Sequence, residues 1–249
     1  MPTFSLPELA LIAFAFFLAG AVKGVLGLGL PTVAIGLLGL LMPVAQAAAL
    51  LIVPSLITNV WQAVRGPHLR ALLRRLWPMQ VAIVLGVFSG AGWMHPEHAR
   101  ASGIFLGVCL LLYGLSGLAG WRLPRPAPRH EMAAGLLAGG STGLVTAATG
   151  VFALPAVPYL QALGLDKDQM TQALGVSFTV STIALALILG NAGSLDASTA
   201  GQSLLALVPA VGGMAAGQAV RGRLSQVAFR KALFGGLIAL GGWLLARQL

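Results

Sequence analysis

Long apolar runs alternate with short polar stretches along almost the whole chain. The apolar runs cover residues 8–30, 31–43, 45–64, 76–94, 101–120, 132–149, 151–164, 169–191, 200–219 and 228–247. A helix needs about 20 residues to cross the hydrocarbon core of a bilayer, so the long runs predict membrane-spanning helices. The runs 31–43 and 151–164 are shorter and are flanked by Gly or Pro, so they predict helices that span only half of the bilayer.

The first two runs meet at a break that is rich in glycine. Gly20, Gly24, Gly27 and Gly29 are followed closely by Pro31. Glycine permits unusual backbone angles and a close approach of other groups, whereas proline interrupts a helix. In a membrane, an interrupted helix must direct its freed backbone groups towards protein, water or a ligand. The break is therefore a candidate part of a binding site.

A second break of this kind, in residues 139–150, suggests that the chain repeats itself. Gly24 pairs with Gly143, 119 positions later, and Leu41 pairs with Leu165, 124 positions later. Weak internal similarity is typical of transporters that are built from two repeats. Chance matching between apolar segments is the alternative, but the broken element recurs at the corresponding place in each half.

Basic residues predict how the chain inserts into the bilayer. Lys and Arg are concentrated in residues 65–75, 121–130 and 220–231, whereas residues 192–199 contain none. Because cytoplasmic loops carry an excess of Lys and Arg, we expect the three basic loops in the cytoplasm and both termini outside. The loop after the third run is then inside in the first half and outside in the second. The two halves are therefore expected to insert with opposite orientation.

Together these patterns predict an all-α polytopic membrane protein with two inverted-topology repeats. Each repeat is expected to contain about four full spans and one short or broken helix, which gives about eight to ten membrane segments. The predicted parts are a first membrane repeat at 1–122, a cytoplasmic basic linker at 123–130 and a second membrane repeat at 131–249. The two short runs are expected either to cross the bilayer or to re-enter it.

Composition agrees with a membrane protein and argues against other classes. Hydrophobic residues make up 57% of the 249 residues and charged residues only 8%, and the mean hydropathy is +0.90. Soluble domains contain about 25% charged residues. Lys and Arg outnumber the acids by 15 to 6, but they lie mostly in short loops, so we do not expect nucleic acid as a partner. Cysteine and histidine form no cluster that suits a metal, and we predict no catalytic residue, metal or cofactor.

Lys23 is the basic residue that we place deep within an apolar run. A charge inside a membrane is expensive and is by default a candidate functional site. One interpretation is that its ammonium group neutralises an anion at the centre of the protein. The alternative is that the long side chain snorkels to the nearer membrane surface.

Hydroxyl and amide side chains supply the other candidate ligands. Thr142, Thr146 and Thr149 share one helical face, and Ser141 lies beside them. Together with the N–H groups of broken helix ends, which carry partial positive charge, their hydroxyls would hold anion oxygens. The alternative is hydrogen bonding within or between helices. The predicted substrate-binding set is Lys23, Gly24, Gly27, Gly29, Asn59, Ser141, Thr142, Thr146, Thr149, Ser177 and Thr182.

The two glycine breaks and the basic linker between them resemble the sulfite exporter TauE/SafE family. The second break is followed by Leu154, Pro155 and Pro158, and the resemblance covers roughly residues 10–247. It implies a transporter of the bacterial cytoplasmic (inner) membrane that moves sulfite, sulfoacetate or related organosulfonates outward. The chain departs from the family pattern at Ala147 and Ala148, where glycines are expected, so a different substrate stays open.

The predicted function is export of a small organic or inorganic anion, such as sulfite or sulfoacetate, through a midplane site between the two broken helices. An anion channel and a transporter of an unrelated small carboxylate are alternatives. A non-transporting membrane subunit and an intramembrane enzyme are further alternatives, although no histidine or carboxylate lies deep within a predicted span.

No acidic residue lies deep enough in a span to couple transport to protons, so we expect uniport driven by the membrane potential. Proton coupling through Lys23 and sodium coupling through backbone carbonyls are the alternatives. The expected partners are a small anionic substrate, the lipid bilayer and a second copy of the chain in a homodimer.

Overall fold

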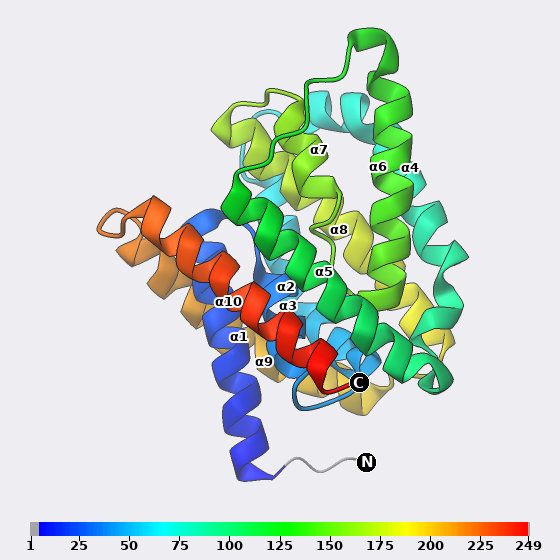
Figure 1. Cartoon of the computed structure of the whole chain (residues 1–249), viewed down its shortest axis with the longest axis vertical. Coiled ribbons are helices and arrows are strands. Elements are labelled where there is room, and N and C mark those ends of the chain that lie inside the picture. The colour runs from blue at the N-terminus through cyan, green and yellow to red at the C-terminus, as the bar shows by residue number, and fades with distance from the viewer. Residues whose placement is uncertain (1–4, 249) are drawn as a thin grey trace.

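The computed structural model describes residues 5–248, which form ten α-helices and two short 3₁₀-helices (Figure 1). The α-helices are α1 (Leu6–Leu26), α2 (Leu30–Leu38), α3 (Val44–Val64), α4 (Leu69–Ser89), α5 (Ala99–Ala119), α6 (Pro128–Thr149), α7 (Ala156–Ala162), α8 (Lys167–Asn191), α9 (Ala197–Val220) and α10 (Gln226–Ala246). The 3₁₀-helices are η1 (Ala91–Met94) and η2 (Pro96–His98). Eight of the helical segments are long and apolar enough to cross a membrane, and the short ones are α2 and α7. The predicted all-α polytopic fold is confirmed.

The first predicted break reverses the direction of the chain. Gly27 and Gly29 have φ angles of +78° and +106°, a region that other residues rarely adopt. The Gly27 N–H donates to the Lys23 carbonyl at 2.7 Å and ends α1. Gly29 then lies against the side chain of Val22, so α2 folds back beside α1. The first broken element is thus a helical hairpin.

The second break has the same form. α6 ends at Gly150, with φ +68°, and α7 follows after a short extended stretch. The Tyr159 hydroxyl of α7 donates to the Glu131 carbonyl in the first turn of α6 at 3.1 Å. α7 therefore runs back towards the start of α6, so both short helices return towards the side from which the preceding long helix came.

Several helices begin or end a few residues away from the predicted apolar runs, and among them α4 and α6 begin within predicted loops. The predicted loop 65–75 is helical from Leu69, because Leu72 and Leu76 continue the buried face of α4 while Arg70 and Arg74 are exposed. α6 begins at Pro128, so residues 128–130 of the predicted linker form its first turn. Proline is favoured at this position because the first N–H of a helix has no intrahelical partner.

The two halves of the chain interlock through equivalent contacts. α1 packs along α9 of the other half, α6 packs along α4, and α5 and α3 pack against α10 and α8. In each half, two glycines one turn apart lie against the backbone of two residues one turn apart. These contacts are Gly20 with Ala210, Gly24 with Met214, Gly139 with Met79 and Gly143 with Ile83. Such matched contacts are what two repeats would give, although the inverted repeat stays a prediction.

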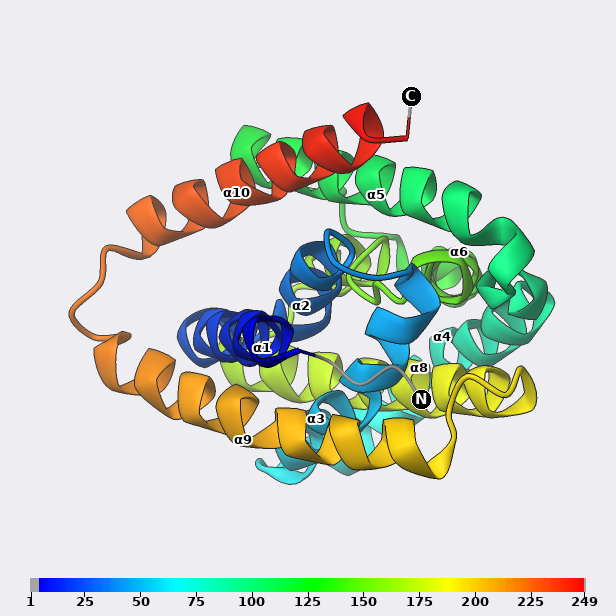
Figure 2. The same cartoon turned by 90° about the horizontal axis from the view of Figure 1, so that it is seen from below.

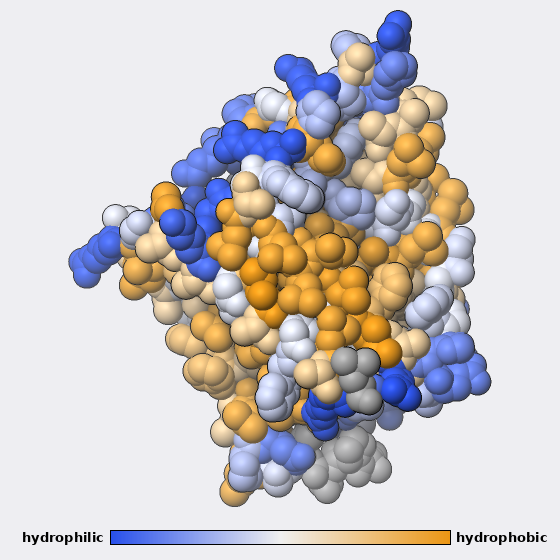
Figure 3. Space-filling model, viewed as in Figure 1, coloured by the Kyte–Doolittle hydropathy of each residue, from blue (hydrophilic) through white to orange (hydrophobic). Residues whose placement is uncertain are grey.

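α8 and α3 are the most buried of the membrane-spanning helices, and almost all of α2 is buried as well. Figure 2 shows α5 and α10 along one side of the molecule and α9 along the opposite side. In Figure 3, hydrophobic residues cover the middle of the visible face and hydrophilic residues gather towards its two ends. An apolar belt between polar ends is the surface that a bilayer requires.

A proline inside α3 explains one polar contact between helices. Pro54 has no N–H, so the Leu50 carbonyl loses its partner within the helix. The Ser203 hydroxyl of α9 donates to this carbonyl at 2.8 Å, and the Val53 N–H donates to Ser203 Oγ at 3.0 Å. Ser203 therefore satisfies the backbone at the proline site.

Replacing Ser203 by alanine is expected to lower the free energy of unfolding by about 1–2 kcal/mol, because it leaves the Leu50 carbonyl of α3 without a hydrogen-bond donor. The measurement is thermal unfolding in detergent. The penalty should shrink in a Pro54→Ala background, where residue 54 can pair with the Leu50 carbonyl. Ser89→Ala is the control, since the exposed Ser89 hydroxyl bonds only to its own helix. Equal effects of Ser203→Ala in the two backgrounds would contradict this explanation.

Candidate functional site

Lys23 is buried in the interior of the protein. Its side chain is only 4% exposed, although it lies one turn before the end of α1. Nζ donates to Thr58 Oγ1 at 3.1 Å and to Asn59 Oδ1, and both of these residues belong to α3. The ammonium group therefore points into the protein and does not snorkel to a surface.

A chain of hydrogen bonds links Lys23 to α8. Asn59 Nδ2 donates to Ser55 Oγ at 2.9 Å, and Ser55 Oγ lies 3.2 Å from Thr182 Oγ1. Because the Thr182 hydroxyl donates to the Phe178 carbonyl at 2.6 Å, Ser55 must donate to Thr182. Each of these hydrogen bonds is donated in the direction from Lys23 towards α8, and Lys23 is the first donor in the series.

No carboxylate balances the charge of Lys23. In residues 5–248 the ion pairs are Arg75 with Glu131 and His98 with Glu97, and neither includes Lys23. Neutral hydrogen-bond partners compensate a buried cation only in part, so the burial is costly. The bonds to Thr58 and Asn59 use two of the three N–H groups of the ammonium. A positive charge and one donor direction are therefore available to an anion.

Gln62 fixes the end of α1 at the first break, one turn after Lys23. Its Nε2 donates to the Gly27 carbonyl at 2.8 Å and to the Thr171 carbonyl of α8 at 2.9 Å. It thereby satisfies a carbonyl at the break and ties three helices together. Gln62 is not in the predicted substrate-binding set, although it ends the same apolar run as Asn59 and lies one helical turn after Thr58.

The hydroxyls of α6 are bonded to their own helix. Thr142, Thr146 and Thr149 each donate to the carbonyl four residues earlier, at 2.7 Å. Thr149 Oγ1 also accepts from the Val151 N–H at 3.1 Å, which caps the break. Ser141 is exposed and donates to the Leu137 carbonyl. Within the described range, no hydrogen bond joins these four residues to the Lys23 network.

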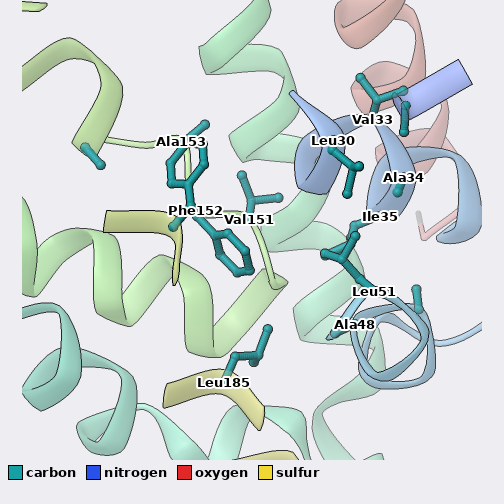
Figure 4. Close-up of a cluster of buried hydrophobic side chains, with 14 of the residues drawn as sticks. Leu30, Val33, Ala34, Ile35, Ala48, Leu51, Val151, Phe152, Ala153 and Leu185 are labelled. Carbon is teal, nitrogen blue, oxygen red and sulfur yellow. The ribbon is translucent and has the colours of Figure 1, made fainter. Parts of the chain in front are cut away.

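The two breaks lie at different levels along α3. The first break is held by Gln62, near the end of α3. At the second break, Gly150 lies against Ile35 of α2 and Ala48, near the start of α3. Figure 4 shows the apolar cluster that the second break forms with α2 and α3, from Leu30 to Phe152. Lys23 and its partners Thr58, Asn59 and Ser55 therefore lie between the levels of the two breaks.

Of the remaining predicted residues, Thr182 joins the Lys23 network and Ser177 accepts a hydrogen bond from Gln80 Nε2 at 3.0 Å. Gly24 packs against the backbone of α9, while Gly27 and Gly29 form the turn after α1. The structure thus connects Lys23 to Asn59 directly and to Thr182 only through Ser55, and it places the glycines around Lys23 as helix-packing and turn residues.

Cavities open at both ends of the molecule but do not reach Lys23. A cavity of about 320 Å³ is lined by Arg75, Met79, Glu131 and Tyr159, at the end with the start of α4 and α6. A cavity of about 430 Å³ at the opposite end is lined by Gln46, Trp93, His95, Ser194 and Thr199 among others. Lys23 lines neither of these two cavities and is only 4% exposed, so its ammonium group is shielded from solvent in this conformation.

Comparison with known proteins identifies the family of the chain. The family model of the sulfite exporter TauE/SafE matches residues 12–244, nearly the whole chain. The comparisons with curated proteins and with solved structures gave no match. The eight apolar helices agree with a multi-pass membrane transporter of the sulfite and organosulfonate type, which this family implies. The resemblance predicted from the glycine breaks is confirmed, and the chain belongs to the sulfite exporter TauE/SafE family.

Proposed function

We propose that the protein exports a small sulfur oxyanion or organosulfonate, such as sulfite or sulfoacetate, and that Lys23 neutralises the anion inside the membrane. The observation that carries the proposal is the burial of Lys23 among neutral partners, with no carboxylate beside it. In a chain of this transporter family, an anion is the ligand that such a charge favours. Asn59 and Thr58 orient the ammonium group, and Gln62 holds the helix end that carries it.

We further propose that the basic end of the protein faces the cytoplasm of a bacterial inner membrane. The start of α4 and the linker at 120–127, which both carry arginines, lie towards the end to which α1 rises in Figure 1. The loop at 221–225 follows α9 beside the end of α1. Cytoplasmic loops carry an excess of Lys and Arg. In the same view α1 rises and α6 descends, which supports two repeats of opposite orientation. Both termini are then outside.

The expected driving force is the membrane potential. The six acidic residues are in first turns of helices, in 3₁₀-helix η2 or at caps: Glu8, Glu97, Glu131, Asp166, Asp168 and Asp196. Proton-driven transporters use titratable groups within the membrane. An inside-negative potential favours export of an anion by about 2.3 kcal/mol per charge per 100 mV.

Flux in proteoliposomes tests this function. With sulfite or sulfoacetate inside, an inside-negative potential of 100 mV is expected to drive the anion outward to a gradient of about 50-fold for each net negative charge that crosses. Taurine is a zwitterion without net charge, so the potential should not drive its flux. Protein-free liposomes control for leakage. If flux follows a pH gradient at zero potential, uniport is wrong. If none of these compounds moves, the proposed substrate class is wrong.

A further inference from the structure

A second buried polar cluster lies where α4 contacts α8. It consists of Gln80 of α4 and of Ser177 and Ser181, which are one turn apart on α8. Gln80 is 8% exposed and both serines are 0% exposed. Gln80 Nε2 donates to Ser177 Oγ at 3.0 Å, and this is the hydrogen bond that holds the cluster together. Ser177 is one of the predicted site residues, but none of the hydrogen bonds of this cluster joins it to the Lys23 network.

Two atoms of the cluster have no hydrogen-bond partner. Within residues 5–248, the buried side-chain atoms without a partner are Gln80 Oε1 and Ser181 Oγ. The neighbouring hydroxyls of Thr179 and Thr182 donate to carbonyls of α8, so the Ser181 hydroxyl departs from the pattern of its own helix. An unpaired buried polar group is costly, and most proteins avoid it. The cluster is therefore built for a partner that is absent from this conformation.

The cluster has no room for that partner while α4 and α8 are in contact. The surfaces of Gln80 Oε1 and Ser181 Oγ are inaccessible even to a water molecule. Water or a substrate can reach these two atoms only when the helices separate. Since a transporter must open its closed site at least once in each cycle, such a separation fits the function of the family.

The cluster lies between the arginine-rich end of the protein and the Lys23 network. Leu76 and Met79 precede Gln80 on α4, and both line the cavity of about 320 Å³ that Arg75 also lines. On the other side, Ser181 precedes Thr182, which belongs to the Lys23 network. An anion that enters the cavity at Arg75 would therefore meet the cluster before it reached Lys23.

We propose that Gln80, Ser177 and Ser181 form a second, uncharged binding station for the transported oxyanion, which opens when α4 and α8 separate. The two serine hydroxyls donate to oxygens of the anion, and Gln80 Oε1 accepts from water that accompanies it or from a protonated oxygen of the ion. Uncharged donors bind an anion weakly enough to release it, as a path with several sites requires. This inference rests on the proposed function.

Thiol labelling tests whether the cluster opens. In a Cys109→Ala background, which removes the single cysteine, Ser181→Cys places a nearly isosteric thiol in the cluster. Ser203→Cys is the matched control, because Ser203 is also 0% exposed but has two hydrogen-bond partners. A membrane-impermeant methanethiosulfonate is added to proteoliposomes with and without sulfoacetate. Sulfite is unsuitable here, because it reacts with the labelling reagent.

The thiol of Ser181→Cys is expected to react about tenfold faster or more during sulfoacetate transport, while Ser203→Cys stays unreactive. Gln80→Met is expected to raise the KM for sulfoacetate about fivefold, because one hydrogen-bonding group is lost. If Ser181→Cys stays as unreactive as Ser203→Cys, the cluster does not open and the proposal is wrong. If it reacts but Gln80→Met leaves KM unchanged, water alone enters and the oxyanion station is wrong. Neither of these two results contradicts the proposed role of Lys23, provided that Lys23→Gln abolishes flux.

Discussion

Lys23→Gln is expected to reduce anion flux by about a hundredfold or more, because it removes a buried charge that would pair with the substrate. Glutamine is one bond shorter than lysine but is uncharged and carries two N–H donors, so it can still donate to Thr58 Oγ1 or Asn59 Oδ1. The change therefore isolates the charge from the hydrogen bonds that position it. Flux of sulfite and sulfoacetate in proteoliposomes is the measurement.

The chain contains matched controls for this substitution. Its other two lysines, Lys167 and Lys231, are exposed at the starts of α8 and α10. Lys167→Gln and Lys231→Gln remove the same charge from the same type of side chain, and both are expected to keep the flux of the wild type. Loss of flux in all three variants would indicate that net charge, not the central site, controls transport.

Thermal stability separates a functional role of Lys23 from a structural one. Burying an uncompensated charge is unfavourable, so its removal should leave the unfolding temperature unchanged or raise it. Loss of flux together with a lower unfolding temperature would mean that Lys23 mainly holds α1 to α3. Normal flux in Lys23→Gln would contradict the anion site and direct attention to the polar groups of α6 and to Gln80.

Much of the fold could be predicted because a bilayer imposes simple rules on the sequence. The lengths of the apolar runs predicted the order of the long helices and the two short helices. The glycine-rich segments predicted the two breaks. The helical start of α4 was not predicted, because residues 69–76 form about two amphipathic helical turns. The arginines on their exposed face made this segment resemble a loop. A search for apolar runs overlooks a helix that extends beyond the hydrocarbon.

The site was only partly predictable because it depends on contacts between distant segments. Lys23 could be identified from its depth in an apolar run. Its connection to Thr182 passes through the contact between Ser55 and Thr182, which are 127 positions apart, and no periodicity in the sequence specifies that pairing. Helical spacing did place Thr142, Thr146 and Thr149 on one face, but it could not show that their hydroxyls are already bonded to α6.

A similarly large effect is expected where the two halves of the chain pack through glycine. Gly139 and Gly140 are adjacent in α6, yet only Gly139 faces the backbone of α4, where an added Cβ would overlap the Met79 carbonyl. A backbone atom cannot move aside as a flexible side chain can. Gly139→Ala is therefore expected to lower the free energy of unfolding by about 3 kcal/mol, measured by thermal unfolding in detergent.

Gly140→Ala provides the matched control, because a Cβ there meets no atom within 4 Å. Alanine is favoured over glycine inside a helix, so this change should be neutral or stabilise the protein by about 0.5–1 kcal/mol. The same contrast is expected in α9 between Gly213, which faces the Phe17 carbonyl of α1, and Gly212, which faces open space. Equal penalties within either pair would mean that the close approach of α1 to α9, and of α6 to α4, does not hold the two halves together. Unequal penalties of similar size in both pairs would show that close glycine contacts hold both interfaces, α6 against α4 and α9 against α1.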